Sequence, residues 1–373
     1  MKITILSPAY PFRGGIANFT NILANELFKY NDVEIVTFKR QYPKVFFPGK
    51  TQLESSENPL LVKSVRLLDS INPINWFTVG KKIKLQKPDV LIFSFWMPFF
   101  APAFGTIAKI VKKNNHTKIL SVCHNVIPHE TKPGDIFLTK YFFSKVDYFI
   151  LLSKKVKNDL LNLLPDANYK ILFHPAYSSF GKPVDKETAK RNLGITNENI
   201  ILFFGLIREY KGLDVLLEAM AEVKEKLKVK LIVAGEFYEN KDKYLKLIEK
   251  YKLNKFVDII DKYIEPANVK YYFSAADAVI LPYKDATQSG IVQLAINFGK
   301  PIIGTNVGGL GEIIENGKNG YIVEPDNPKK LSESIIKFYK ENKEFDFSEN
   351  IKITAGKFSW EKFIFELINF VKI

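Results

Sequence analysis

The chain has 373 residues, of which 46% are hydrophobic and 25% charged, with a net charge of +14 and a mean hydropathy of −0.06. This length suits two domains, and this apolar content suits buried cores, which argues against a disordered chain. No apolar run is long enough to span a bilayer or to act as a signal peptide, and the single cysteine, Cys123, excludes an internal disulfide, so we expect a cytoplasmic protein.

Basic residues are concentrated in the first half of the chain. Residues 1–178 contain 24 Lys and Arg against 12 Asp and Glu, a net charge of +12, whereas the remaining residues balance 30 against 28. Solvated surface lysines account for such an excess, and an anionic membrane, an anionic substrate or nucleic acid are the alternatives. No recognisable nucleic-acid-binding module is present, so we expect no nucleic acid partner.

The first half alternates strand patterns with helix patterns. The expected strands are residues 2–7, 33–38, 89–95, 118–123, 147–152 and 170–173, and the expected helices are 16–29, 72–86 and 102–113. Residues 40–60 contain three prolines and are expected to form a long functional loop. This alternation predicts a parallel, doubly wound sheet.

The same alternation restarts after a polar, turn-rich passage at residues 177–186. The expected strands are 200–204, 229–234, 257–260, a run ending at 281, and 301–304. The expected helices are 213–226, 241–251, 267–274, 291–298, 310–315, 327–341 and 360–372. We therefore expect an α/β protein of two domains, 1–178 and 179–356, followed by a C-terminal helix in 357–373. Ligands of such folds bind at the carboxyl ends of the strands, here in a cleft between the domains.

Residues 282–320 hold eight of the chain's 20 glycines. Gly290 and Gly309 each precede an expected helix that follows a strand. Helix N-termini offer free N–H groups and a positive dipole end, and glycine lets a phosphate approach the backbone closely. Ordinary strand-to-helix turns are the alternative interpretation.

Two cations follow the strand at 200–204. Arg208 and Lys211 are three residues apart at the entrance of a helix, where Arg could hold a diphosphate bidentately and Lys as a point charge. In the first half, His124 ends a strand and could hydrogen-bond a substrate hydroxyl or transfer a proton. His129 and Glu130 follow it, and a histidine bonded only within its own loop is the alternative, favoured for His129.

Together these motifs resemble the GT-B glycosyltransferases of the large retaining family 4, the glycosyl transferases group 1. The resemblance covers essentially the whole chain and depends on the order and spacing of its motifs. The matching motifs are Gly14-Gly15-Ile16, His124-Asn125, Gly205-x-x-Arg208-x-x-Lys211-Gly212, Gly299-Lys300-Pro301, Gly308-Gly309-x-x-Glu312, Asn319-Gly320 and Phe358-Ser359-Trp360.

The resemblance implies a role for each matching position. Arg208 and Lys211 would stabilise the leaving diphosphate, and His124 would contact the transferred sugar. The other implied contacts with the nucleotide sugar are Gly15 and Gly205 at the diphosphate, Tyr263 and Ile264 at the base, and Gly290, Ile291 and Val292 through their N–H groups. Such enzymes stabilise leaving-group charge with cations and helix ends, without a metal ion or other cofactor. The lack of a D-x-D motif and of a Cys/His cluster agrees with that expectation.

One departure from the family concerns two glutamates eight positions apart before Gly-Lys-Pro. Ala286 and Leu294 occupy those positions, and Leu294 cannot hold a ribose. The nearby polar side chains are Asp285, Gln288, Ser289 and Gln293. We expect Asp285, Gln288 and Ser289 to contribute to donor binding.

The sequence therefore predicts a retaining, metal-independent hexosyltransferase that uses a UDP- or GDP-sugar and acts on a glycan or lipid-linked acceptor. The first domain would bind the acceptor and the second the donor, in surface polysaccharide or glycolipid synthesis. Peripheral attachment to the inner face of the membrane is a further hypothesis, based on the basic first half and on Trp76, Phe77, Phe99 and Phe100. The alternative is that at least half of these aromatics belong to the protein core.

Three alternatives remain. A nucleotide-sugar epimerase of the same fold would need carboxylate pairs, and only Glu130 and Asp285 are evident. A non-catalytic nucleotide-sugar-binding protein would explain the missing glutamates. A nicotinamide dehydrogenase is disfavoured because no G-x-G-x-x-G follows the first strand.

Overall fold

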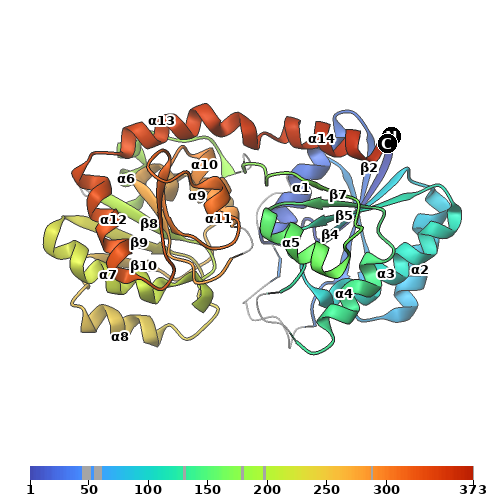
Figure 1. Cartoon of the computed structure of the whole chain (residues 1–373), viewed down its shortest axis with the longest axis horizontal. Helices are drawn as coiled ribbons and strands as arrows, with labels where there is room; N and C mark the ends of the chain where they lie inside the picture. The colour runs from blue at the N-terminus through green and yellow to red at the C-terminus, as the bar shows by residue number, and fades with distance from the viewer. Residues whose placement is uncertain are drawn as a thin grey trace. The chain divides into compact units, whose positions relative to one another are not determined.

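The computed structural model describes residues 1–43, 52–53, 61–128, 132–177, 180–195, 199–286 and 289–372. The chain divides into two compact units, one comprising Met1–Pro175 with Ser359–Ile373 and the other Ala176–Phe358. Each unit is built on one parallel sheet with helices on its faces (Figure 1). The chain enters the second unit once and leaves it once.

The first unit contains a seven-stranded sheet in the order β3-β2-β1-β4-β5-β6-β7, and every neighbouring pair is parallel. The strands are β1 (Lys2–Leu6), β2 (Asp32–Arg40), β3 (Lys63–Asp69), β4 (Val90–Phe95), β5 (Lys118–Cys123), β6 (Tyr148–Leu151) and β7 (Tyr169–Ile171). All six residues of β4 are buried, as expected for an apolar strand covered on both faces.

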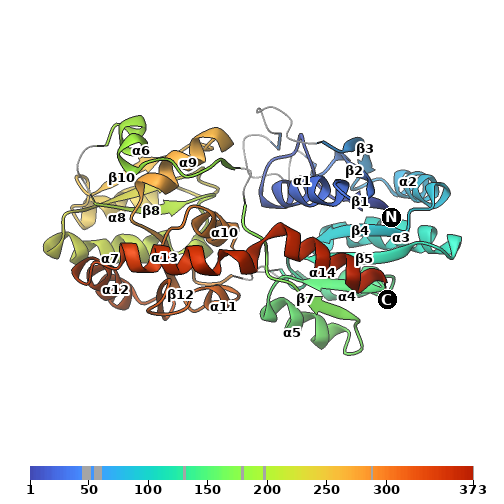
Figure 2. The same ribbon diagram turned by 90° about the horizontal axis from the view of Figure 1, so that it is seen from above.

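Helices α2, α3 and α4 of the first unit pack in succession against one another, while α1 contacts α14. The helices of this unit are α1 (Gly15–Phe28), α2 (Pro73–Gln86), α3 (Ala101–Val111), α4 (Asp135–Phe143), α5 (Lys154–Leu163) and α14 (Trp360–Lys372). Figure 2 shows α14, drawn in red, beside α1.

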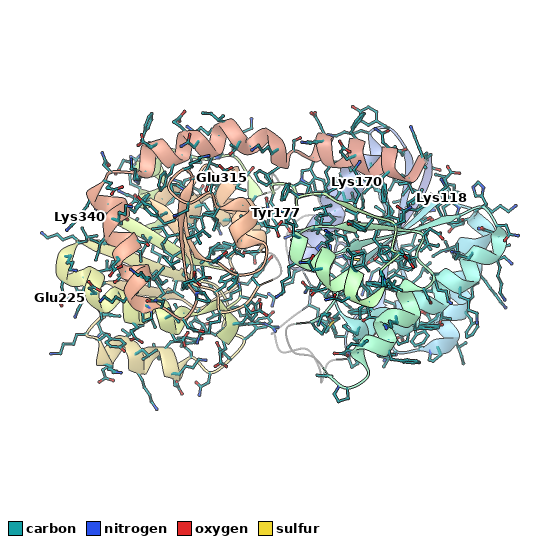
Figure 3. All side chains as sticks on the ribbon, in the orientation of Figure 1. Lys118, Lys170, Tyr177, Glu225, Glu315 and Lys340 are labelled. Carbon is teal, nitrogen blue, oxygen red and sulfur yellow. The ribbon has the colours of Figure 1, made fainter. Side chains whose placement is uncertain are left out.

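Helix α14 is joined to the first unit by polar and aromatic contacts. Lys118 Nζ donates to the carbonyl of Val371 at 2.7 Å, and Lys170 forms an ion pair with Glu366 (both lysines are labelled in Figure 3). The ring of Phe19, on α1, meets the ring of Trp360 at a centroid distance of 5.2 Å. Helix α14 therefore packs onto the first unit and contributes to its core.

The second unit contains a six-stranded parallel sheet in the order β10-β9-β8-β11-β12-β13. Its strands are β8 (Asn199–Phe204), β9 (Val229–Ala234), β10 (Val257–Ile260), β11 (Ala278–Leu281), β12 (Ile302–Thr305) and β13 (Gly320–Val323). Its helices are α6 (Lys186–Leu193), α7 (Leu213–Lys226), α8 (Asp242–Lys250), α9 (Pro266–Ala275), α10 (Gly290–Asn297), α11 (Leu310–Ile313), α12 (Pro328–Lys340) and α13 (Glu344–Thr354).

The predicted parallel, doubly wound α/β architecture is confirmed, but several elements were not predicted. The edge strand β3, with sequence KSVRLLD, was missed because its charged residues interrupt the apolar run. Helices α4, α5, α6 and α13 were also missed. Of the predicted loop at 40–60, residues 44–51 and 54–60 lie outside the described residues, and Leu53 forms an isolated antiparallel bridge with Phe12.

Candidate functional site

A loop held rigidly in place follows β8 in the second unit. Gly205 has a φ of +101°, and Ile207 N–H donates to the carbonyl of Glu236 at 2.9 Å. A single 3-10 turn, Glu209–Lys211, then leads to Gly212, whose φ is +68°. A Cβ on Gly212 would stand only 1.9 Å from the carbonyl oxygen of Pro282, so this loop and the end of β11 meet backbone to backbone.

Lys211 is buried at the end of this loop, although lysine is rarely buried without a partner. Burial, with a smaller effect from the positive charge of Arg208, lowers its pKa to about 7. Its Nζ lies 5.7 Å from the ring centre of Tyr283. Arg208 is exposed, and its guanidinium lies 5.3 Å from the ring centre of Tyr238. Lys211 is thus buried with a pKa near neutral pH, whereas Arg208 faces solvent.

A second loop, after β11, carries the cap of α10. Thr305 Oγ1 donates to the carbonyl of Tyr283 at 2.5 Å, which fixes this tyrosine at the start of the loop. The Tyr283 hydroxyl lies 3.2 Å from Ser289 Oγ, and Ser289 Oγ accepts from the N–H of Ile291 at 3.3 Å. Ser289 is therefore the N-cap of α10, as its sequence position favours.

The two loops meet at Gly205. A Cβ at this position would stand 3.1 Å from Ile291 Cδ1 and 3.2 Å from Lys211 Nζ. The rings of Tyr210 and Tyr283 make an edge contact at 6.2 Å. A lysine, an arginine on the same loop and a capped helix N-terminus therefore gather at the carboxyl ends of β8 and β11, and this combination suits an anion.

The other residues predicted to bind the nucleotide-sugar donor differ in their burial and position. Gln288 lies outside the described residues. Asp285 lies in the second loop, where its charge raises the pKa of Tyr210 in addition to the larger effect of burial. Tyr263 and Ile264 follow β10, and the side chain of Ile264 is buried. Val292 is also buried.

The two positions without glutamate are both internal. Ala286 and Leu294 are 1% and 4% exposed, so both side chains belong to the protein interior. Beside Leu294 on α10, the side-chain oxygen of Gln293 is buried and has no hydrogen-bond partner among the described residues.

In the first unit, His124 follows β5 directly. Its N–H donates to the carbonyl of Phe95 at 2.8 Å, and its ring meets the edge of Phe19 at 4.9 Å. Burial, with a smaller effect from His174, lowers its pKa to about 3, so the imidazole is neutral at physiological pH. Its Nε2 has no hydrogen-bond partner among the described residues. His124 therefore retains an unused polar atom.

Other predicted residues of the first unit are placed as follows. Gly15 is the first residue of α1, and Gly14, with a φ of +110°, is the one whose backbone favours glycine. His129 and Glu130 lie outside the described residues.

Sequence reasoning missed the tyrosines that lie beside these two loops. Tyr283 is buried next to Lys211, and Tyr238 lies beside Arg208. A Cβ on Gly290 would stand 3.1 Å from the ring of Tyr177, which is labelled in Figure 3. Tyr238 and Tyr283 each stand within four residues of a strand's carboxyl end, which was the available sequence signal.

Comparisons with known proteins give a consistent result. Residues 185–358 match the family described as glycosyl transferases group 1. The chain is 27% identical to an uncharacterized glycosyltransferase of Methanocaldococcus jannaschii, over 97% of this chain and 95% of that protein. It is also 27% identical to D-inositol 3-phosphate glycosyltransferase 1 of Catenulispora acidiphila, over 69% and 66% of the two chains.

Solved structures resemble the whole chain. Sucrose-phosphate synthase from Thermosynechococcus elongatus superposes with a TM-score of 0.76 at 17% identity, covering 99% of this chain and 98% of that one. The Anabaena protein HepE in complex with UDP gives a TM-score of 0.76 at 16% identity, with full coverage of both chains. The fold is that of the GT-B glycosyltransferases, and the family match with the sequence relatives supports sugar transfer as the activity.

Metal-ligand clusters and membrane-spanning helices are both absent from the described residues. No three His, Cys, Asp or Glu side chains of these residues gather where they could hold a metal ion. No helix within the described ranges has both the length and the apolar character needed to cross a membrane.

Proposed function

We propose that this protein transfers a hexose, with retention of anomeric configuration and without a metal ion, from a UDP- or GDP-sugar to a glycan or lipid-linked acceptor. The observation that carries this proposal is the gathering of buried Lys211, exposed Arg208 and the capped start of α10 in the second unit. The Anabaena protein has been solved with UDP and with UDP-glucose, which supports a nucleotide sugar as partner.

Negative charge develops on the diphosphate when the sugar leaves. Arg208 is proposed to hold it bidentately and Lys211 as a point charge, with the N–H group of Gly290 directed at the same anion. The N–H of Ile291 is already bonded to the Ser289 cap. Fixed donors and cations of this kind act on the transition state because they need no reorganisation during the reaction. Lys211 would take up a proton as the diphosphate binds, since its pKa is near neutrality without that anion.

The sugar and the nucleoside need their own polar contacts. His124 is proposed to hydrogen-bond a hydroxyl of the transferred sugar through the unused Nε2, as a neutral imidazole rather than an acid. Gly15 and Gly205 are proposed to let backbone approach the diphosphate. Tyr263 and Ile264 are proposed to contact the base, and Asp285 with Gln288 to replace the missing glutamates.

The proposed setting is the synthesis of a surface polysaccharide or glycolipid. The enzyme would be cytoplasmic and would work at the inner face of the membrane, in peripheral contact through its basic first unit. The excess of lysine in residues 1–178 supports this part of the proposal.

Incubation with UDP- and GDP-sugars tests the proposal. Sugar transfer to an added acceptor, or slow nucleotide release without one, is expected from the wild type and lost in Arg208→Ala. The anomeric configuration of the product, read by NMR, tests retention. Donor binding without turnover would instead favour a non-catalytic nucleotide-sugar-binding protein, and conversion of the donor sugar without an acceptor would favour an epimerase.

A further inference from the structure

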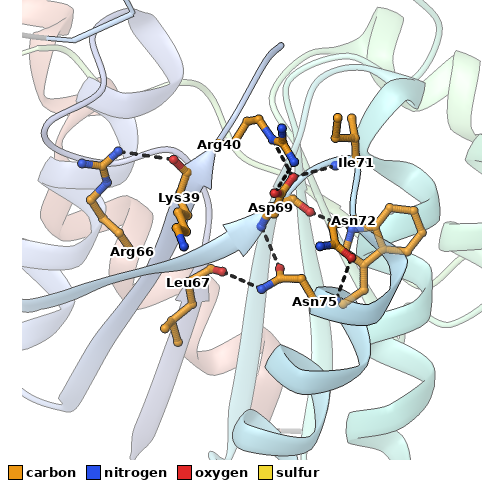
Figure 4. Close-up of polar contacts among 9 residues, drawn as sticks. Lys39, Arg40, Arg66, Leu67, Asp69, Ile71, Asn72 and Asn75 are labelled. Atoms are coloured by element: carbon orange, nitrogen blue, oxygen red, sulfur yellow. Dashed lines mark hydrogen bonds and ion pairs between the residues drawn. The ribbon is translucent and has the colours of Figure 1, made fainter.

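Helix α2 starts from a polar network that fixes its orientation (Figure 4). Asn72 Oδ1 accepts from the N–H of Asn75 at 3.3 Å. The side chain of Asn75 bridges the N–H of Asp69 at 2.7 Å and the carbonyl of Leu67 at 3.0 Å. The indole N–H of Trp76 donates to the carbonyl of Asp69 at 2.8 Å. These bonds connect α2 to the end of β3 and turn Trp76 toward the body of the unit.

The opposite side of α2 is an apolar stripe that faces solvent. Ile74, Phe77 and Leu85 are 79%, 54% and 82% exposed, and Lys81 lies between them. Their spacing of i, i+3, i+7 and i+11 places all four on one side of the helix. Solvated helix faces are normally polar, so this stripe is unusual for a helix that covers a sheet.

Helices α2, α3 and α4 form one layer, in which a glycine of one helix contacts a side chain of the next. A Cβ on Gly80 of α2 would stand 3.0 Å from Ile110 of α3. A Cβ on Gly105 of α3 would stand 2.5 Å from the ring of Tyr141 of α4. Helices α2 and α3 therefore pack closely at Gly80, and helices α3 and α4 at Gly105.

Helix α4 adds a second exposed apolar site to this layer. Ile136 and Phe137 are 55% and 75% exposed, and Lys140 is exposed one turn further along. We call Ile74, Phe77, Leu85, Ile136 and Phe137 the apolar sites of the layer.

The part of the chain that contains this layer, with β4 and β5, is also strongly basic. Residues 70–147 contain 11 lysines, no arginine and four Asp or Glu, a net charge of +7. Two of these carboxylates, Asp89 and Asp147, pair with His116 and Lys112. Lys81 and Lys82 on α2 are exposed, and no described carboxylate forms an ion pair with either.

We propose that the apolar sites of the layer, with α2 foremost, insert into an anionic lipid surface while the lysines around them bind the headgroups. Lysine suits this task because its apolar stem lies along the acyl boundary while its ammonium stays in water. The proposal deepens the membrane contact proposed above, but it does not depend on sugar transfer.

A second copy of this chain is the competing occupant, and charge disfavours it. A two-fold interface would bring the same patch against itself and place Lys81 and Lys82 opposite lysines. Anionic headgroups instead neutralise this charge.

The structure shows which of the four aromatic residues named from the sequence are exposed and could contact a membrane. Phe100 is fully buried and belongs to the core of the first unit, as the alternative interpretation of these aromatics expects. Trp76 and Phe99 are partly buried and pack against the same core. Of the four aromatics singled out in the sequence, only Phe77 is exposed.

Flotation with vesicles, in the absence of donor, tests the proposal. The wild-type protein is expected to float with vesicles of phosphatidylglycerol and phosphatidylcholine, and not with phosphatidylcholine alone. The variant Ile74→Ser/Phe77→Ser/Leu85→Ser should bind at least tenfold more weakly, and Lys81→Glu/Lys82→Glu should lose binding at moderate salt. A matched control is Phe345→Ser/Ile353→Ser in the second unit, whose side chains are 73% and 79% exposed and which should bind like the wild type.

Each other outcome overturns the proposal. Wild-type protein that stays unbound to anionic vesicles contradicts it, as does equal binding by the triple serine variant. A dimer detected by light scattering that is lost in the triple variant, without vesicle binding, assigns the stripe to a second copy. Nucleotide release from a UDP- or GDP-sugar in vesicle-free buffer is measured in parallel, so failure of membrane binding and failure of sugar transfer are separated.

Discussion

The ammonium nitrogen of Lys211 lies 3.2 Å from the point where a Cβ on Gly205 would stand. On the other side of the same point, Ile291 Cδ1 lies at 3.1 Å. Any side chain at position 205 would therefore displace either the buried cation or the first turn of α10. Glycine at position 205 thus allows the strand end, the lysine and the helix start to lie this close together.

Donor binding should weaken as the pH rises above neutrality. Burial lowers the pKa of Lys211 to about 7, so the ammonium form that attracts a diphosphate is lost at higher pH. An unfolded lysine keeps its proton up to about pH 10, so stability without donor should rise with pH between about 7 and 10. Calorimetry with UDP or GDP in two buffers at pH 8 should detect proton uptake on binding. An affinity that does not change between pH 6 and pH 9 would contradict this assignment.

Arg208→Ala and Lys211→Ala should each reduce turnover by roughly a hundredfold, because a lost charge contact costs about 3 kcal/mol in the transition state. Stability should change far less. Lys211→Met should melt at the same or a higher temperature, since it removes the desolvation of a buried ammonium while keeping the side-chain volume. Lys226→Met, at an exposed position paired with Glu222, is the control and should leave turnover unchanged. Unchanged kinetics for both Arg208→Ala and Lys211→Ala would remove the diphosphate assignment.

Activity should persist in EDTA. The sequence offers no D-x-D motif and no Cys/His cluster, and Arg208 with Lys211 supplies the positive charge that a metal would otherwise bring. The measurement is the transfer rate before and after chelation, and again after added manganese or magnesium. A strict, reversible requirement for either ion would contradict the proposed mechanism.

The sequence allows the cations of the site to be predicted, but not their surroundings. Arg208 and Lys211 follow a recognisable strand within a few residues, so the helix entrance is a local signal. The neighbours of Lys211 are distant in sequence, since Tyr283 reaches it from the loop after β11. Likewise β3 is an edge strand, where pairing with β2 rather than apolar periodicity decides its structure. Tertiary contacts determine the surroundings of Lys211 and the structure of β3, and local sequence patterns do not indicate such contacts.

The loop after β11 should recognise the donor through Asp285 and Gln288. Gln288→Ala is expected to raise the donor KM or lower kcat about tenfold, equivalent to ~1.4 kcal/mol, and Asp285→Ala should act in the same direction. Ser289→Ala should mainly reduce stability, by about 1 kcal/mol, because Ser289 caps α10. If both Asp285→Ala and Gln288→Ala show parental donor kinetics, the ribose is held by backbone alone.

His124 should remain neutral throughout the working pH range. Burial lowers its pKa to about 3 and that of His174 to about 4, both below the ordinary value of 6.5. The folded protein resists protonation that the unfolded chain accepts, so stability should fall as the pH drops below about 6.5. The imidazole resonances of both residues should be constant in NMR spectra between pH 5 and pH 9. A titration of His124 near pH 6 would indicate that it is accessible and can act as an acid.

The return of α14 to the first unit also determines the order in which the protein is completed during synthesis. Phe19 packs against Trp360 and Phe363, which the ribosome adds after the entire second unit. The second unit is continuous in sequence and is ready to fold first, while the N-terminal portion of the nascent chain carries an uncovered apolar site around Phe19. A chain whose synthesis stops before Trp360 would keep that site exposed, which makes it a substrate for chaperones and proteases. The apolar site around Phe19 is therefore covered only after α14 has been synthesised.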